Sequence, residues 1–143
     1  MADHRVLLVD DEVEFSQILQ ERLEARGLRV DTAASGEEAL QAAASRSFDA
    51  ILLDLAMPGM DGIETLKRLR AADPDLQIIL LTGNATVGVS VEAMKLGAVD
   101  LLEKPADLKE LILKIDEAST RKSELAQRRL DEQLNDLLRR RGW

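Results

Sequence analysis

Short apolar runs alternate with longer amphipathic stretches along most of this chain. Five runs are apolar at nearly every position, and each is too short to form a helix. Strands that are buried on both faces of a sheet have this composition. The five predicted strands cover residues 6–9, 28–30, 50–53, 78–81 and 99–102.

The stretches between these runs repeat apolar side chains at helical spacing, and several of their ends carry a recognisable signal. Gly27 ends the first predicted helix and Gly97 ends the fourth. Ser35 caps the second, with Glu38 three residues later, and the third stops before residues 73–74, Asp-Pro. A fifth helix follows the last strand. Strands and helices in strict alternation predict a doubly wound α/β fold, with a parallel sheet covered on both faces.

The last part of the chain differs from the rest in charge. Residues 121–143 hold seven basic and four acidic side chains, so this segment carries +3 and residues 1–120 carry −11. We therefore divide the chain into a folded domain over residues 1–120 and a C-terminal helical extension over residues 121–143. The extension is too short to form a second domain.

The extension has no proline and carries a narrow apolar stripe. The stripe consists of Leu130, Leu134, Leu137 and Leu138. Between residues 116 and 124 only Ala118 is apolar, so no continuous heptad seam is predicted. A helix over residues 107–141 would be about 50 Å long, which exceeds the width of a small domain. We expect it to protrude, to fold back after a break or to pack on a partner; a frayed, solvated tail is the alternative.

Composition excludes several classes of function. The chain has 143 residues, a net charge of −8 and a pI near 4.7, so its surface repels nucleic acid and anionic lipid. It has no cysteine, one histidine and only three aromatic residues, which excludes thiolate chemistry, multi-histidine metal sites and base-stacking surfaces. No signal peptide or membrane span is predicted, so a cytoplasmic location is expected.

Polar side chains follow four of the predicted strands. Asp10 and Asp11 follow the first strand, Asp54 the third, Thr82 the fourth and Lys104 the fifth. Ligands of parallel α/β sheets bind at this edge, where the carboxyl ends of the strands meet. Three neighbouring carboxylates repel one another, and Mg²⁺ is a cation that takes oxygen ligands. The sequence therefore predicts a magnesium site here.

Asp54 is the candidate nucleophile of this site. It precedes a turn rich in proline and glycine over residues 55–62, which we expect to expose it, and a carboxylate can form an aspartyl phosphate. Lys104 and Thr82 would then bind phosphoryl oxygens. The alternative for the acidic residues 10–12 is an ordinary helix start, because carboxylates there are stabilised by the helix dipole.

Two further residues adjoin this set. Gly83 follows Thr82 and leaves room for a ligand or for backbone movement. Pro105 follows Lys104, and a cis bond between them would fix the direction of the lysine.

The chain resembles the receiver domain of bacterial two-component response regulators over residues 4–120. The matching stretches are residues 6–12 (VLLVDDE), 52–62 (LLDLAMPGMDG), 79–83 (ILLTG), 93–98 (AMKLGA) and 103–105 (EKP). The resemblance implies a flavodoxin-like fold with strand order 2-1-3-4-5 and a stand-alone receiver without an output domain. It implies that a histidine kinase or a phosphotransfer protein is the phosphoryl donor.

The resemblance also implies the role of each acidic residue. Asp54 accepts the phosphoryl group from a phosphohistidine. Asp11, Asp54 and the backbone carbonyl of Ala56 bind Mg²⁺, and Asp10 contacts the ion through water.

The same resemblance implies a signalling face. Thr82 and Lys104 sense the phosphoryl group and rearrange the surface formed by the fourth helix, fifth strand and fifth helix, the switch region that includes Gly83 and Pro105. Leu101 stands where the family usually has Tyr or Phe, which departs from the usual aromatic switch. Ala56 and Asn84 occupy the positions that tune the lifetime of the phosphoryl group.

Other functions compete with this interpretation. A receiver-like adaptor or dimerisation module would bind partners without phosphorylation. A phosphatase of the haloacid dehalogenase type would need a second Asp where Ala56 stands, and a flavin or nucleotide domain would not place acidic residues in its first loop.

The expected partners follow from the phosphorylated receiver. They are the phosphoryl donor, a downstream protein and a second copy, bound through the signalling face or the C-terminal helix. No direct nucleic-acid or membrane contact is expected, and no enzyme activity beyond the protein's own phosphotransfer and dephosphorylation.

Overall fold

The structure, a computed structural model, describes residues 4–55, 57, 62–83 and 87–142. In this part of the chain one parallel sheet has the strand order β2-β1-β3-β4-β5, as predicted. The strands are β1 (Arg5–Val9), β2 (Arg29–Ala33), β3 (Ala50–Asp54), β4 (Ile78–Thr82) and β5 (Asp100–Glu103). The helices are α1 (Val13–Glu24), α2 (Gly36–Ser45), α3 (Gly62–Ala72), α4 (Val87–Lys95) and α5 (Leu108–Arg140).

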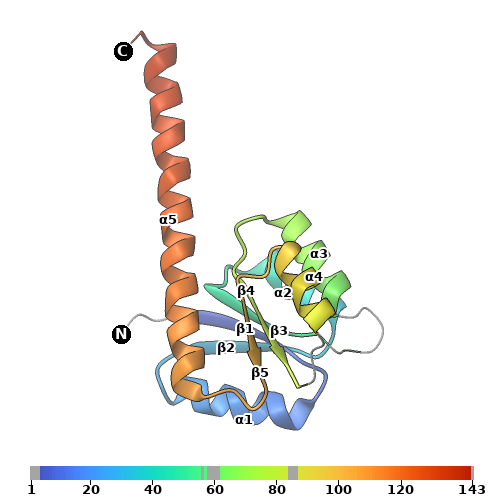
Figure 1. Cartoon of the computed structure of the whole chain (residues 1–143). Coiled ribbons are helices and arrows are strands. Elements are labelled where there is room, and N and C mark those ends of the chain that lie inside the picture. Colours follow the sequence, from blue (N-terminus) through green and yellow to red (C-terminus); the bar gives the residue numbers. More distant parts are fainter. Residues whose placement is uncertain (1–3, 56, 58–61, 84–86, 143) are drawn as a thin grey trace.

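Two apolar cores lie on opposite faces of the sheet, because successive strand residues point to opposite sides. On β1, Leu7 and Val9 belong to the core beneath α2, α3 and α4, whereas Val6 and Leu8 belong to the core beneath α1 and the first part of α5. Figure 1 shows these two helical layers around the twisted sheet. The continuous apolar runs in the sequence are therefore strands buried on both faces.

The predicted helix ends are confirmed at three positions. Gly27 has a φ of 92° and Gly97 a φ of 107°, the left-handed conformation that ends a helix without strain in glycine. The hydroxyl oxygen of Ser35 accepts a hydrogen bond from the Glu38 N–H at 3.2 Å.

The second strand lies further along the chain than predicted. The N–H of Leu28 donates to the carbonyl of Leu23 at the end of α1, so Leu28 still belongs to the helix-ending motif. The strand begins at Arg29 and continues to Ala33, because each of its residues pairs with β1. Leu28 is buried, which explains why its position looked like part of a strand.

Helix α5 is continuous through residue 120 and extends past the domain (Figure 1), so the protruding form of the predicted helix is confirmed. Its 33 residues span about 50 Å. The first part packs on the sheet through Leu111, Ile115 and Ala118. In the described part of the chain, none of the helices is long and apolar enough to cross a membrane.

Polar contacts hold α5 against the amino-terminal end of the sheet. Ser119 donates to Asp49 at 3.1 Å, and Lys122 donates to the carbonyl oxygen of Phe48 at 2.5 Å. Arg121 donates to Gln77 at 3.0 Å, and Arg129 pairs with Asp75 at 2.6 Å. We call these residue pairs the α5–sheet contact.

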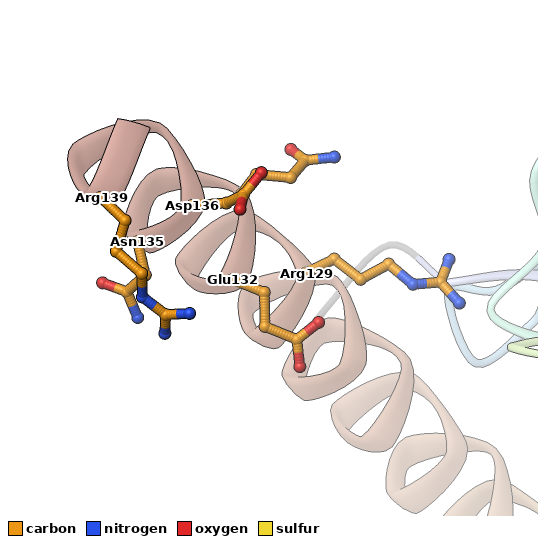
Figure 2. Close-up of a pocket in the computed structure, with 6 residues that line it drawn as sticks. Arg129, Glu132, Asn135, Asp136 and Arg139 are labelled. Atoms are coloured by element: carbon orange, nitrogen blue, oxygen red, sulfur yellow. The ribbon is translucent and has the colours of Figure 1, made fainter. Parts of the chain in front are cut away.

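Figure 2 shows the side chains on the protruding part of α5. Arg129 points toward the domain, while Asn135 and Arg139 extend on another side of the helix.

Candidate functional site

Three carboxylates meet at the carboxyl ends of β1 and β3. One oxygen from each of Asp10, Asp11 and Asp54 lies within 4.8 Å of the others. The register explains this proximity, because Val9 pairs with Leu53 and the next residues of the two strands are therefore Asp10 and Asp54. The predicted convergence is therefore confirmed for the three carboxylates.

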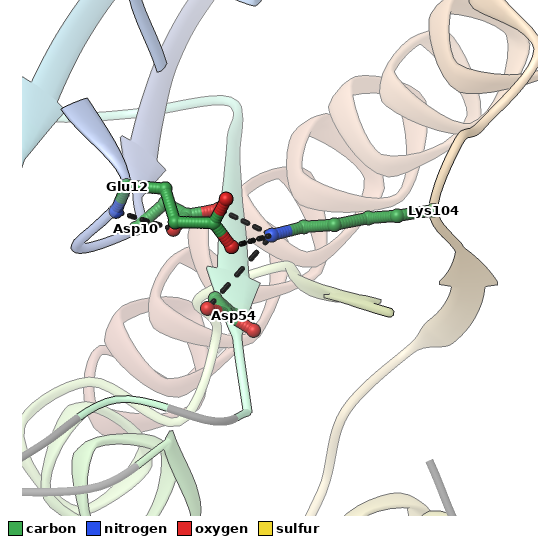
Figure 3. Close-up of polar contacts among 4 residues, drawn as sticks. All are labelled: Asp10, Glu12, Asp54 and Lys104. Carbon is green, nitrogen blue, oxygen red and sulfur yellow. Dashed lines mark hydrogen bonds and ion pairs between the residues drawn. The ribbon is translucent and has the colours of Figure 1, made fainter. Parts of the chain in front are cut away.

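Lys104 reaches into this acidic cluster from the end of β5 (Figure 3). Its Nζ lies 2.6 Å from Asp10 Oδ2 and 3.8 Å from Asp54 Oδ2. The backbone positions the lysine, because its N–H donates to the carbonyl of Thr82 at 2.8 Å. The Lys104 ammonium group is therefore paired with both buried carboxylates.

Two contacts of Lys104 were not predicted. Glu12 Oε1 lies 3.8 Å from its Nζ, and the centre of the Phe15 ring lies 4.3 Å from the same nitrogen. Both residues lie within one turn of the start of α1. The sequence offered only the proximity of these residues to Asp10 and Asp11, which does not indicate the direction of a side chain.

Asp10 is held by backbone groups as well as by the lysine. Its Oδ1 accepts the N–H of Glu12 at 2.9 Å, and its own N–H donates to the carbonyl of Ala33 at 3.0 Å. These bonds fix the carboxylate where β1 passes into α1.

The prediction that the turn after β3 exposes Asp54 is wrong. The Asp54 side chain is 5% exposed and that of Asp10 is 1% exposed. Asp54 is the last residue of β3 and Thr82 the last residue of β4, so each lies within the sheet rather than after it. Only Asp11 of the three carboxylates is exposed.

Gly62, which was part of the matching motif but had no assigned role, packs on the backbone of Asp54. A Cβ at Gly62 would lie 2.3 Å from Leu55 Cα and 2.5 Å from the Asp54 carbonyl oxygen. Its N–H donates to the carbonyl of Leu55 at 3.1 Å. No other residue type fits without moving the end of β3, so the start of α3 packs directly on the backbone of Asp54 and Leu55.

The remaining predicted residues differ in what surrounds them. Gly83 is exposed, and a Cβ there would meet nothing within 4 Å, in agreement with the predicted room beside Thr82. The Lys104–Pro105 bond is cis. Leu101 is half-buried against the core beneath α4. Ala56 and Asn84 lie outside the described residues.

An apolar groove of about 130 Å³ lies between α1 and the start of α5, and one of its lining residues is Phe15, whose ring contacts Lys104. Phe15, Ile18 and Pro105 line it, and Ile18 is 52% exposed. The groove therefore places an accessible apolar surface next to Lys104.

The donor set suits a hard divalent cation. Carboxylate oxygens are the ligands that Mg²⁺ prefers in proteins, and Asp10, Asp11 and Asp54 supply three within a single ion's reach. A parallel sheet of order 2-1-3-4-5 with such a cluster at its carboxyl edge defines the class of receiver domains.

The comparison with known families agrees with this class. Residues 6–116 match the family model of the response regulator receiver domain, and the chain belongs to that family. Receiver domains from Methanospirillum hungatei and Clostridium thermocellum have similar structures. Their TM-scores are both 0.81, at 29% and 32% sequence identity, with 86% and 85% of this chain and 98% of each of those chains covered.

Curated relatives include two regulators of transcription. The transcriptional regulatory protein ZraR of Klebsiella oxytoca is 41% identical over 113 residues, which cover 79% of this chain and 26% of ZraR. The DNA-binding transcriptional regulator NtrC of Escherichia coli K12 is 36% identical over 124 residues, which cover 87% of this chain and 26% of NtrC. This chain thus spans about a quarter of the length of these relatives.

Proposed function

We propose that this protein is a phosphorylation-dependent signalling receiver, in which Asp54 accepts a phosphoryl group in the presence of Mg²⁺. The donor is the phosphohistidine of a kinase or phosphotransfer protein in the cytoplasm. Residues 1–120 form the receiver, and residues 121–143 extend it. Within this chain, signalling occurs through contacts with proteins rather than with DNA, as in a stand-alone receiver.

The observation that carries the proposal is the cluster of Asp10, Asp11 and Asp54 with Lys104 among them. Two buried carboxylates beside a third are costly to hold together, and one lysine does not neutralise them. A bound Mg²⁺ would neutralise the carboxylates and draw phosphoryl oxygens toward them. Asp11, Asp54 and the carbonyl of Ala56 would bind the ion, with Asp10 in contact through water.

The residues of the chain have distinct tasks in the transfer. An oxygen of Asp54 attacks the phosphorus, the P–N bond to the donor histidine breaks, and the imidazole nitrogen keeps the electron pair and takes up a proton. Lys104 exchanges part of its contact with Asp10 for a phosphoryl oxygen, which charge-assisted hydrogen bonding favours. The Thr82 hydroxyl donates to another phosphoryl oxygen. Water later hydrolyses the aspartyl phosphate to the free carboxylate and inorganic phosphate, and we expect no catalysis by the chain beyond this transfer and this hydrolysis.

The signal then passes to the surface formed by α4, β5 and α5. Thr82 is the last residue of β4, and Lys104 directly follows β5. A change in their contacts therefore acts on the next residues along the chain, Gly83 and Pro105. Leu101 replaces the aromatic side chain usual in the family, so the response here relies on aliphatic packing. Ala56 and Asn84 set the lifetime of the phosphoryl group.

The apolar groove beside Lys104 supports a protein donor. A helix that carries a phosphohistidine could bury apolar side chains against Phe15 and Ile18 while its imidazole faces Asp54. An adaptor that works without phosphorylation would not need the acidic cluster, and no observation favours it.

The test is the mass of the intact protein after incubation with acetyl phosphate and Mg²⁺. We expect a phosphoryl adduct in the wild-type chain that requires Mg²⁺ and is absent in Asp54→Ala. The matched control is Asp49→Ala, because Asp49 belongs to the α5–sheet contact at the other end of the sheet. A wild-type chain without an adduct, or an adduct that persists in Asp54→Ala, contradicts the proposal.

A further inference from the structure

The protruding part of α5 carries an apolar stripe that nothing in the described chain covers. The exposed fractions of its leucines are 60% for Leu130, 55% for Leu134 and 53% for Leu137. Leu138, at 38%, borders the stripe. Helices of this kind are stabilised mainly by packing of their apolar face, and an isolated helical end is marginal in water.

The direction of the stripe follows from the helical repeat. Eighteen residues make about five full turns, so residues 18 apart lie on the same side of a helix. Arg129 is thus aligned with buried Leu111, and it does contact the domain through Asp75. Leu134 is aligned with Asp116, which bonds to His4 at 2.8 Å beside the start of β1.

The opposite flank of α5 faces β5. Lys114 pairs with Asp100 of β5 at 2.9 Å, and this hydrogen bond, with the charge of Asp100, raises the pKa of Lys114 above its ordinary value. Since Lys114 and Asp116 point about 160° apart around the helix, the leucine stripe lies on the flank away from β5. It is therefore separate from the surface formed by α4, β5 and α5.

We propose that this stripe is the seam of a homodimer in which the protruding ends of two α5 helices pack side by side and antiparallel. The occupant is a second copy of this chain. The spacing of Leu130, Leu134 and Leu137 by four and three residues is that of two-helix packing.

The distribution of charge along α5 and the domain favours an antiparallel arrangement of two copies. Residues 139–141 are three consecutive arginines, and a parallel pair would place both sets together. An antiparallel pair instead brings each set toward the base of the partner helix, where Glu124 lies and the acidic domain with its charge of −11 begins. The chain is thus complementary to itself: a basic helical end and an acidic body.

The seam is short, so we expect a low affinity between the two copies. Three leucine layers from each helix bury less than the roughly 1,200 Å² typical of stable complexes, so the dimer is a weak and reversible one. Its population depends on protein concentration.

Sedimentation equilibrium of the full chain tests the seam, at concentrations from about 10 µM to about 1 mM. We expect a reversible monomer–dimer equilibrium, with the association constant reduced at least about tenfold in Leu134→Glu. The matched control is Leu113→Glu, since Leu113 lies on the same helix and is 55% exposed like Leu134. Circular dichroism of both variants checks that the helix is retained.

Three results would overturn the seam. They are a chain that stays monomeric throughout this range, a dimer that Leu134→Glu leaves intact, and a dimer that Leu113→Glu weakens as strongly. None of these depends on phosphorylation, so the seam and the proposed function can fail separately.

A spin label tests the direction of the helices. The chain has no cysteine, so Ser123→Cys provides a unique attachment point on the stripe's side of α5. An antiparallel pair centred midway between Leu130 and Leu134, the register that brings residue 140 opposite Glu124, separates the two labels by about 30 Å, whereas a parallel pair brings them within about 10 Å. The longer distance supports the proposal, and the shorter distance overturns its orientation.

Discussion

The two ends of the sheet are both rich in charged side chains, but the charges are arranged in opposite ways. At the amino-terminal end, Asp75 has its own arginine in Arg129, and Asp49 accepts two hydrogen bonds, from the Arg5 N–H and from Ser119. At the carboxyl end, Asp10 and Asp54 share one lysine, and the carboxylate of Asp11 lies beside them. The first arrangement satisfies its charges within the chain, while the second leaves an excess that a bound ligand can compensate.

This difference separates structure from function. Groups that are fully paired within the fold contribute to stability, whereas groups held near like charges lower it and persist where a ligand uses them. Substitutions made in matched pairs at the two ends test this difference.

The largest effect is expected from removing the lysine. Lys104→Met removes the ammonium group that pairs with the buried carboxylates of Asp10 and Asp54, so we expect the free energy of unfolding to fall by about 3 kcal/mol without divalent cations. Lys122→Met, in the α5–sheet contact, removes only hydrogen bonds to Phe48 and Ser47 and should cost about 1 kcal/mol. Urea unfolding with and without Mg²⁺ measures both variants.

Adding Mg²⁺ should distinguish the stabilities of these two variants further. Millimolar Mg²⁺ should restore most of the stability lost in Lys104→Met, because the ion replaces the missing positive charge, and should not change Lys122→Met more than the wild type. Equal losses in the two variants, or no recovery with Mg²⁺, would show that the two ends do not differ as described.

An intermediate effect is expected at the backbone that holds Asp54. Gly62→Ala forces a methyl group into the Asp54 carbonyl and the Leu55 Cα, which should lower stability by about 2 kcal/mol and slow phosphorylation by acetyl phosphate. Gly83→Ala meets open space and should leave stability within about 0.5 kcal/mol of the wild type. Thermal unfolding and intact mass measure the two responses, and similar behaviour of the two variants would contradict this role for Gly62.

The smallest effect has the opposite sign. Asp54→Asn removes one of three crowded negative charges, so the variant should be more stable than the wild type by about 1 kcal/mol without divalent cations. Asp75→Asn breaks a satisfied pair with Arg129 and should lose about 0.5 kcal/mol. Differential scanning calorimetry in EDTA compares them; a loss of stability in Asp54→Asn would mean that the acidic cluster is not under strain.

Much of the fold and the main members of the cluster could be predicted from the sequence. Strands buried on both faces leave continuous apolar runs, and the residues that follow them must meet at one edge of a parallel sheet. That logic located Asp10, Asp11, Asp54 and Lys104 without any distance. Helix ends at Gly27 and Gly97 were equally predictable, since the left-handed backbone there favours glycine.

Other properties depend on contacts between segments far apart in the chain. The burial of Asp54 and the close approach of Gly62 come from how α3 packs on β3, which no local pattern encodes. The direction of α5 also remained open, because it depends on pairs such as Arg121 with Gln77, 44 residues apart. The ring of Phe15 beside Lys104 is a third example, since a lone aromatic residue at a helical position looks like ordinary core.

The length of α5 has a mechanical consequence. The helix is held to the domain as far as Arg129, which pairs with Asp75, and ends at Arg140, so about 16 Å of helix extends beyond this contact. A tilt of about 10° beyond Arg129 would displace the tip by about 3 Å, about half the rise of one helical turn. A small adjustment beneath α5 is therefore magnified into a change of position that a neighbouring molecule can distinguish.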